Sequence, residues 1–499
     1  MIDNIHVISA DKTKKQTAWQ IVYNNFKGPE RRAIEFLNKE VGKRVLREEG
    51  IYSIYVLPII KEAIGIDLAK NTILISQWQD SALIQQYVNE DELTEDAYLL
   101  KIIDNPVDPA FSLVIITAKK AINLFYGATC LLDHYAPKYA PQSGGMVYTK
   151  RIFDQKLPNC TITSAPTFKN RGIFVWGHPI NDYKLFFEQA ARQGLNQIVL
   201  WNQYKPLNAD DICTYADSLG IEILWGYSWG WQGCAKMTTL TDEFLQELKE
   251  QVIREYEELY ADTNAGIYFQ SFTERMDDNI GGRSIAKTVT EFVNDTAGEL
   301  LKRYPNLHIQ FGLHANSVHK HLDEIAKVDK RIEIVWENGG TFPFAMGLLR
   351  PKDKARYEKE FEQTLDFTKS ILCLRGIDAP TCIILKGFAK LEWARFVDQS
   401  GPFILGENSA EIREHDKKLR QNSWRAHTAD WMHLGKYATA FVKWIQDVSH
   451  GNANVCMAGT YDGGVFFPMA ACSELFWNPD REFEEIAKAA MDKDFVEID

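Results

Sequence analysis

The sequence lacks the patterns that mark several large classes of protein. No run of about 18 apolar residues occurs among the 499 residues, so no membrane-spanning helix is predicted. The eight cysteines are scattered, without a CxxC pair or a Cys/His cluster at zinc-ligand spacing, which predicts reduced, mostly buried thiols and no metal site. No GxGxxG follows a strand and no Walker A sequence appears, so we expect no cofactor.

Positive charge is also scarce. The net charge of −12 argues against a nucleic acid as the natural partner, because such binding draws on clustered Lys and Arg. Hydrophobic residues at 45% and charged residues at 25% are typical of a globular protein. The first 15 residues lack the apolar core of a secretory signal, which predicts a cytoplasmic protein, or a secreted one if a signal peptide has been removed. A homo-oligomer is compatible with this composition.

Two styles of sequence meet near residue 160. At this length two or three domains are expected. Residues 51–58, 71–77 and 111–118 have the composition of short strands, and 119–136 has helical periodicity, which predicts an α+β domain over residues 1–160. The stretch 139–168 is rich in Pro, Gly, Ser and Thr and is typical of an interdomain linker.

From residue 171 onward, apolar runs alternate with amphipathic helices. The eight runs begin at residues 171, 196, 221, 265, 308, 332, 381 and 453. This pattern predicts a (β/α)₈ TIM barrel over residues 161–470, followed by a C-terminal helical extension, 471–499, that is compatible with a longer chain. An open, doubly wound sheet is the competing architecture. Residues 403–409 compete for the place of strand seven or eight.

The ends of these predicted strands are rich in aromatic, amide and charged residues. In a barrel, functional residues gather at the carboxyl ends of the strands. Indole rings there can stack on sugar rings while amides and carboxylates bind hydroxyls, so we predict a carbohydrate substrate. The alternative is that several of the tryptophans only close the barrel or pack against loops. The candidate binding residues are Trp176, His178, Trp201, Asn202, Trp225, Trp229, His314, Asn316, Trp336, Asn338, Lys386, Glu392, Trp393 and Asp462.

Two glutamates follow strand-like runs four and six. Glycoside hydrolysis needs one carboxyl group to protonate the leaving oxygen and a second to activate water or attack the sugar, and Glu274 and Glu337 fit these needs. The alternative is that one of them is only a salt-bridge partner at the rim. Asp277 and Asp278 could orient a substrate acetamido group, but we favour a helix cap or a turn. Arg171 begins the first strand, where a barrel-bottom ion pair is expected.

Several segments resemble glycoside hydrolases that carry an α+β domain ahead of a (β/α)₈ barrel. The matching stretches are 51–58 with 121–135, the opening strand RGIFVWG (171–177), GIYFQSFTE (266–274) with the helix after it, and ACSELFWNPDREF (471–483). They are similar to the α-glucuronidases of families 67 and 115 and, more weakly, to the hexosaminidases of families 20 and 84.

This resemblance implies roles for the two glutamates. It makes Glu274 the general acid and places Glu337 on a strand that carries another functional carboxylate. The local sequence is Trp-Glu-Asn, whereas family 115 has Trp-x-Asp-Asp, which leaves the base open. The Asp-Glu pair of family 20 is not found, and the aspartate pair of family 84 would have to be Asp277 and Asp278.

The hypothesis is therefore an α-glucuronidase-like glycoside hydrolase that acts on an oligosaccharide. The resemblance to α-glucuronidases implies inversion of the anomeric centre, whereas the residues alone leave retention and inversion open. Two alternatives remain open. One is a substrate-assisted β-N-acetylhexosaminidase-like enzyme, and the other is a non-catalytic barrel that binds glycans or partner proteins.

Overall fold

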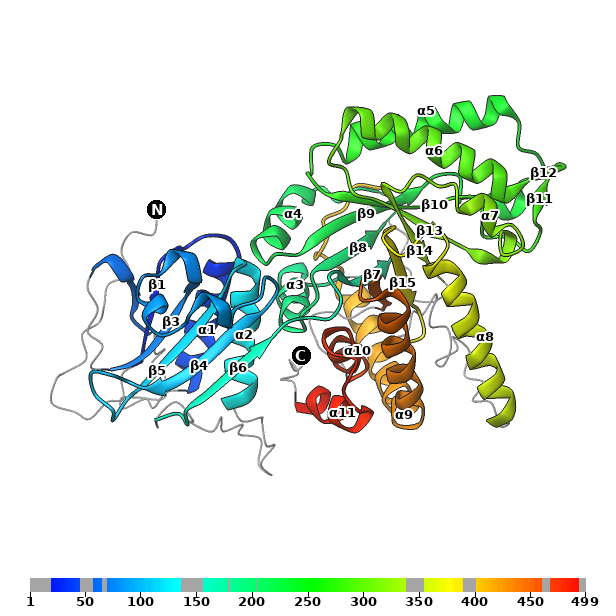
Figure 1. The fold of residues 1–499 in the computed structure, drawn as a ribbon. Coiled ribbons are helices and arrows are strands. Elements are labelled where there is room, and N and C mark those ends of the chain that lie inside the picture. The colour runs from blue at the N-terminus through cyan, green and yellow to red at the C-terminus, as the bar shows by residue number, and fades with distance from the viewer. Residues whose placement is uncertain are drawn as a thin grey trace. The chain divides into compact units, whose positions relative to one another are not determined.

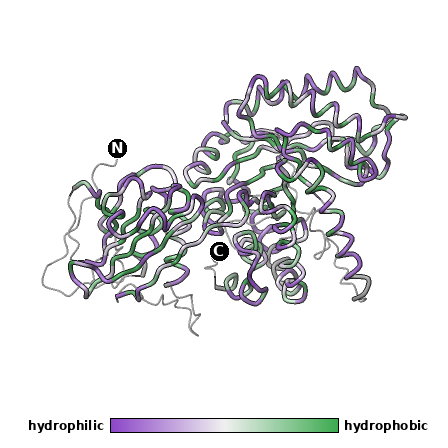
Figure 2. Tube along the Cα trace, viewed as in Figure 1, coloured by the Kyte–Doolittle hydropathy of each residue, from purple (hydrophilic) through white to green (hydrophobic). Residues whose placement is uncertain are grey.

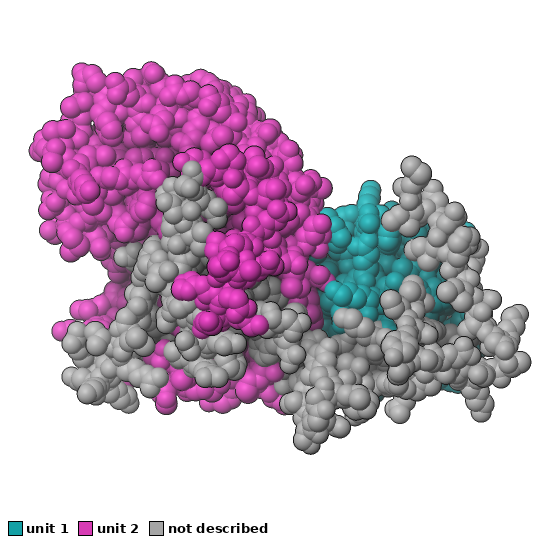
Figure 3. All heavy atoms as spheres, turned by 180° about the vertical axis from the view of Figure 1, so that it is seen from behind, with its two compact units in different colours: residues 1–166, 218–220, 492–494 teal, residues 167–217, 221–491, 495–499 magenta. Residues whose placement is uncertain are grey.

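The computed structural model describes residues 19–44, 57–64, 70–135, 156–177, 180–202, 204–337, 354–388, 401–459 and 467–492. The chain divides into two compact units, one formed mainly by residues 1–166 and the other mainly by residues 167–491 (Figure 3). A mixed sheet makes up the first unit and a closed parallel barrel makes up the second (Figure 1). The predicted α/β fold class, with a smaller α+β domain ahead of a TIM barrel, is thereby confirmed.

The N-terminal unit is a six-stranded sheet in the order β2-β1-β3-β5-β4-β6. Strands β1, β2, β3 and β5 run parallel to one another, whereas β4 is antiparallel to both of its neighbours. The strands are β1 (Trp19–Tyr23), β2 (Ile59–Lys61), β3 (Asn71–Gln77), β4 (Tyr98–Asp104), β5 (Ser112–Ala118) and β6 (Cys160–Ser164), and the helices are α1 (Gly28–Arg44) and α2 (Ala121–Tyr135).

Most of the predicted elements of this unit are present. Strands β3 and β5 and helix α2 lie where the sequence places them, whereas most of the predicted strand 51–58 lies outside the described residues. The linker prediction is wrong in part, because Cys160–Ser164 forms the edge strand β6 and pairs with β4. This strand alternates between partly and fully exposed residues, so it carries no apolar run to reveal it.

The second unit is a barrel of eight parallel strands in the order β10-β13-β14-β15-β16-β7-β8-β9. All eight predicted strands are found, and residues 403–409 form no strand. The strands are β7 (Arg171–Trp176), β8 (Gln197–Trp201), β9 (Glu222–Ser228), β10 (Gly266–Gln270), β13 (Ile309–Leu313), β14 (Ile332–Trp336), β15 (Thr381–Leu385) and β16 (Asn454–Ala458).

Helices connect consecutive barrel strands, as parallel pairing requires. Hydrophilic and hydrophobic residues alternate along these helices, whereas the strands are mainly hydrophobic (Figure 2). The helices are α3 (Tyr183–Arg192), α4 (Ala209–Ser218), α5 (Asp242–Leu259), α6 (Ile285–Arg303), α7 (Leu322–Ile325), α8 (Lys354–Leu372), α9 (Ala410–Ser449), α10 (Phe467–Trp477) and α11 (Phe483–Asp492). None of the described helices has the length and hydropathy needed to cross a membrane.

Side chains at alternate strand positions fill the barrel interior. Phe174, Trp201 and Tyr268 belong to one buried cluster with Val335 and Cys456, contributed by five different strands. Because successive residues of a strand face opposite sides, their sequence neighbours point outward to the helices. This alternation decides which residues at the strand ends can reach a site inside the barrel mouth.

A polar network fills the opposite, amino-terminal end of the barrel. His308 lies between Glu222 at 2.7 Å and Glu333 at 2.9 Å, and Gln310 and Asn454 also donate to Glu333. Burial would lower the pKa of His308, but its hydrogen bonds to the two carboxylates prevail and raise the pKa to about 10.

Arg171 lies at this end of the barrel as well. It donates hydrogen bonds to the carbonyl oxygens of Gly194 and Phe168, both at 2.6 Å, and its guanidinium lies over the Trp477 ring. These contacts anchor Arg171 at the bottom of the barrel.

Candidate active site

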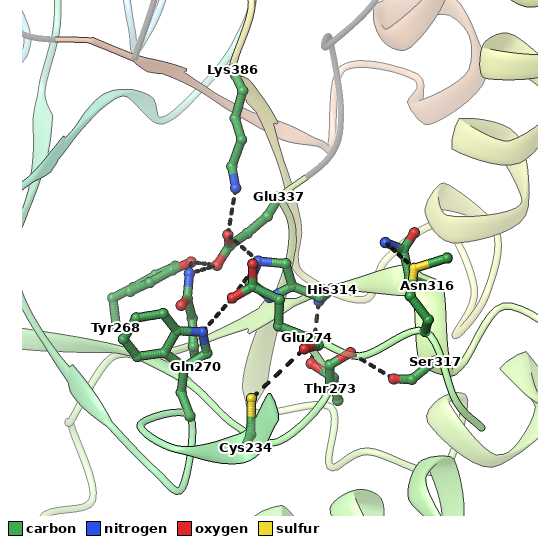
Figure 4. Close-up of polar contacts among 12 residues, drawn as sticks. Cys234, Tyr268, Gln270, Thr273, Glu274, His314, Asn316, Ser317, Glu337 and Lys386 are labelled. Atoms are coloured by element: carbon green, nitrogen blue, oxygen red, sulfur yellow. Dashed lines mark hydrogen bonds and ion pairs between the residues drawn. The ribbon is translucent and has the colours of Figure 1, made fainter. Parts of the chain in front are cut away.

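Glu337 lies at the centre of a group of donors at the carboxyl ends of the barrel strands (Figure 4). It directly follows β14 and its side chain is fully buried. Lys386 Nζ lies 2.7 Å and His314 Nε2 lies 3.1 Å from its Oε2 atom. The Tyr268 hydroxyl and the Gln270 amide both donate to its Oε1 atom. All the oxygens of this carboxylate are therefore satisfied within the barrel.

The donors keep Glu337 ionised despite its burial. Burial alone would raise the pKa of the carboxyl group, since a charge is costly away from water. The charges of His314 and Lys386 and the hydrogen bonds outweigh that effect and lower the pKa to about 2. Conversely, burial and the adjacent carboxylate raise the pKa of Tyr268 well above its ordinary value, so its hydroxyl keeps its proton and donates it.

Glu274 lies in the loop after β10, four residues beyond the end of that strand. Its side chain is 47% exposed, and Trp231 Nε1 donates to Oε2 at 2.5 Å. His314 Nε2 lies 3.8 Å from the same oxygen. Because this nitrogen is 3.1 Å from Oε2 of Glu337, the two carboxylate oxygens are at most 6.9 Å apart, the sum of the two distances. The structure thus brings the two predicted carboxylates together around His314.

The loop of Glu274 is anchored to the end of β13. The backbone N–H of His314 donates to Thr273 Oγ1 at 3.4 Å, and Ser317 Oγ donates to the Thr273 carbonyl at 2.6 Å. The Cys234 thiol lies 3.7 Å from the carbonyl oxygen of Glu274. These contacts hold the backbone at Thr273 and Glu274, while the Glu274 side chain is partly exposed and accepts from Trp231.

Three indole rings form a wall beside the carboxylates. Trp176 and Trp201 stack with ring centres 4.6 Å apart, and Trp231 meets both of them edge-on. Trp231 links this wall to Glu274 through its N–H. Trp176 and Trp201 are buried, whereas Trp231 is partly exposed, so Trp231 is the ring of this wall that a sugar can reach beside the carboxylates.

Three other tryptophans predicted to bind substrate face away from this site. Trp225 stacks on Tyr260 and donates to Thr263. Trp229 stacks on Phe269, and Trp336 meets Phe367 of helix α8. The binding roles predicted for Trp225, Trp229 and Trp336 are therefore corrected. These rings are buried between the barrel and its surrounding helices, where they pack the protein.

The rim of the β10 loop carries the remaining acidic and amide candidates. Asp277 pairs with Arg275 at 3.2 Å and is 71% exposed, while Asp278 lies 3.9 Å from both Lys320 and His321. Ser284 caps helix α6, so the aspartates occupy the turn before the short β11–β12 ribbon (Asn279–Ile280 and Arg283–Ser284). The positions of Asp277 and Asp278 therefore agree with the turn that the sequence analysis favoured for them. Asn316 is exposed and lies 3.9 Å from the sulfur of Met276.

Of the remaining candidates, Asn202 lies within the described residues, and no described contact joins it to the central group. Asn202 directly follows β8 and is partly exposed. The remaining five predicted residues lie outside the described residues: His178, Asn338, Glu392, Trp393 and Asp462.

Three residues of the site were missed at the sequence level. Tyr268 and Gln270 occupy inward positions of β10, and Gly312 lies opposite them on β13. A side chain at Gly312 would collide with the Tyr268 hydroxyl and the Glu337 carboxylate. Strand alternation, counted in steps of two along β10, was the signal that could have identified Tyr268 and Gln270.

No group of three or more His, Cys, Asp or Glu side chains is arranged to hold a metal ion within the part of the chain that the structure describes.

The chain was compared with known proteins. No protein-family model matches, and no curated protein matches. A solved family GH138 enzyme targeting pectin rhamnogalacturonan II aligns with 94% of this chain at a TM-score of 0.52 and 11% identity. The chain shares its barrel fold with this glycoside hydrolase. A family GH115 4-O-methyl-α-glucuronidase with specificity for decorated arabinogalactans aligns with 93% at a TM-score of 0.48 and 13% identity. The chain spans 65% of the first and 57% of the second.

Proposed function

We propose that this chain is a glycoside hydrolase, α-glucuronidase-like, in which Glu274 is the general acid and Glu337 is the base or nucleophile. The observation that carries the proposal is that one nitrogen of His314 lies 3.1 Å from one carboxylate and 3.8 Å from the other. Cleavage of a glycosidic bond requires two carboxyl groups on either side of the scissile bond, and these two lie close enough together to serve.

The different surroundings of the two glutamates support their assignment to different roles. Glu337 is buried among cations and donors that hold its pKa near 2, so it is an anion at neutral pH. Glu274 is half exposed on a loop, where it can reach the oxygen of a departing group. An anion inside the barrel and an accessible carboxyl group at its mouth match the two parts of the reaction.

The indole wall supports a carbohydrate as the substrate. The resemblance of residues 266–274 to α-glucuronidases supports a uronic acid glycoside in particular. The fold shared with the GH138 enzyme agrees with a carbohydrate substrate. The hexosaminidase alternative receives no support from Asp277 and Asp278, since their partners are cations on the rim and not the central carboxylates.

The test is a panel of aryl uronides and N-acetylhexosaminides supplied to the wild-type protein, Glu274→Gln and Glu337→Gln. We expect Glu274→Gln to lose about 10²–10⁴-fold in kcat on substrates with poor leaving groups and much less on activated aryl glycosides. Glu337→Gln should be inactive on both kinds of substrate while still folded by circular dichroism.

Asp277→Asn is the matched control, because it removes a carboxylate from the same loop without touching the central group. It should keep full activity. Loss of activity in Asp277→Asn with N-acetylhexosaminides as substrates would support the hexosaminidase alternative. Glycan binding without turnover by the wild-type protein would support the non-catalytic alternative.

A further inference from the structure

We propose that His314 is a positioning residue whose Nε2–H is shared between the two carboxylates and follows the negative charge as it moves from Glu337 to Glu274. This inference rests on the proposed function and adds a third residue to it. His314 follows directly after β13, and its side chain is only 9% exposed.

The two ring nitrogens of His314 have different surroundings. Nε2 faces Oε2 of Glu337 at 3.1 Å and Oε2 of Glu274 at 3.8 Å, so a proton on this nitrogen is donated to Glu337, and Glu274 needs only a small approach of its exposed side chain to accept it instead (Figure 4). The other ring nitrogen, Nδ1, is buried and has no hydrogen-bond partner among the described residues. Nothing described therefore competes with the carboxylates for the orientation of the ring.

Cleavage moves negative charge from one of these oxygens to the other. In the resting site Glu337 is ionised, and the shorter contact of His314 is the one to Glu337. When Glu274 gives its proton to the leaving oxygen it becomes a carboxylate. At the same time Glu337 loses its charge, either by bonding to the sugar carbon or by taking a proton from the attacking water.

A single N–H between the two groups can stabilise both charge distributions without a large movement. Its hydrogen bond shortens toward Glu274 as the bond to Glu337 weakens. Preorganised donors aimed at developing charge are worth about 10²–10³-fold in kcat when one is removed. No proton leaves His314 in this scheme, so the proton count of the reaction is unchanged.

The other charged or titratable groups that face this pair are few in the described chain. Lys386 contacts Glu337 from the end of β15 and Tyr268 contacts it from β10, while the Cys234 thiol lies 3.7 Å from the carbonyl oxygen of Glu274. Lys386 Nζ lies 2.7 Å from Glu337, whereas His314 Nε2 lies between the two carboxylates.

The test compares His314→Leu, which removes the donor, with His314→Gln, which keeps an amide N–H of similar reach. On a glycoside that the wild-type protein cleaves, we expect His314→Leu to lose about 10²–10³-fold in kcat with little change in KM. The pH at which kcat/KM falls on the acid side of its pH profile should rise by roughly one unit or more in His314→Leu, since Glu337 loses a neighbouring positive charge. His314→Gln should recover part of kcat.

His319→Leu is the matched control, because His319 is exposed on the same segment and bonds only to the carbonyl of Asn316 among its described contacts. Wild-type kcat and an unmoved acid limb in folded His314→Leu would overturn the inference while leaving the proposed function intact. A loss of kcat without any pH shift or rescue by Gln would also overturn it, since a purely structural role predicts that result. If the wild-type protein cleaves no glycoside, the proposed function fails and this inference fails with it.

Discussion

The contact between Glu337 and Lys386 makes a stability prediction that does not depend on any substrate. Both side chains are buried, and their charged atoms lie 2.7 Å apart. Replacing Glu337 by Gln leaves the ammonium group of Lys386 without its carboxylate. Breaking one side of a buried pair costs about 3–5 kcal/mol in the free energy of unfolding, so Glu337→Gln should be less stable than the wild-type protein by this amount at pH 7.

The pH dependence of this loss follows from the lowered pKa of Glu337. The pKa falls from 4.5 to about 2 on folding. A carboxyl group with a lowered folded pKa stabilises the fold above its unfolded pKa and loses that stabilisation as the pH falls toward the folded pKa. At about 1.4 kcal/mol per pKa unit, the full effect is about 3 kcal/mol, of which about 2 kcal/mol is lost between pH 4.5 and pH 3. Gln does not titrate, so the stability gap between the two proteins should narrow by that amount.

The assay is urea-induced unfolding followed by tryptophan fluorescence at pH 7, 5, 4 and 3, because buried tryptophans of the barrel report on its core. The control is the double variant Glu337→Gln/Lys386→Met, which removes both partners. It should be more stable than Glu337→Gln at pH 7, since the buried ammonium group is removed together with the carboxylate. A gap that stays constant from pH 7 to pH 3, or a double variant no more stable than the single one, would refute the reasoning.

Three further predictions concern other parts of the barrel. Gly312→Ala places a Cβ against the Tyr268 hydroxyl and Glu337, so we expect a loss of about 1–3 kcal/mol in thermal or urea unfolding together with a loss of activity. In His308→Gln the stability deficit should be full below pH 6.5 and should shrink as the pH approaches 10, because the raised pKa of His308 stabilises the fold only while the ring is protonated; a deficit that grows with pH contradicts this. Trp231→Phe keeps an aromatic ring but loses the N–H that binds Glu274, so kcat should fall about tenfold or more while the melting temperature stays nearly the same.

The barrel could be predicted because its strands are buried on both faces. Runs such as QIVLW and TCIIL are apolar throughout, and each is followed by an amphipathic helix. The edge strand Cys160–Ser164 was missed because only alternate residues of it are covered, and its Thr and Ser content matches that of a loop. Burial on both faces thus leaves a signal in the sequence that an edge strand does not leave.

The site could be predicted in part for a related reason. The position of Glu337 directly after a strand fixes it at the barrel mouth, and Glu274 was found by the same argument although the strand ends four residues earlier. The tryptophans could not be sorted in this way. Trp201 and Trp225 both lie in apolar strands, yet the first faces the interior and the second faces the helices. Facing direction depends on the register of each strand, which composition does not determine.

The surroundings of Glu337 also bear on how it would act. A carboxylate whose pKa is held near 2 by its neighbours takes a proton from water only weakly, so it is a poor general base. Direct attack on the sugar carbon needs no proton transfer to Glu337, and a stabilised carboxylate also departs readily when the intermediate is hydrolysed. The donors around Glu337 therefore favour the nucleophile role, with retention at the anomeric centre, over the inversion that the α-glucuronidase resemblance implies. Proton NMR of the first-formed product anomer distinguishes the two, and an inverted product would show that the donors release Glu337 when the substrate binds.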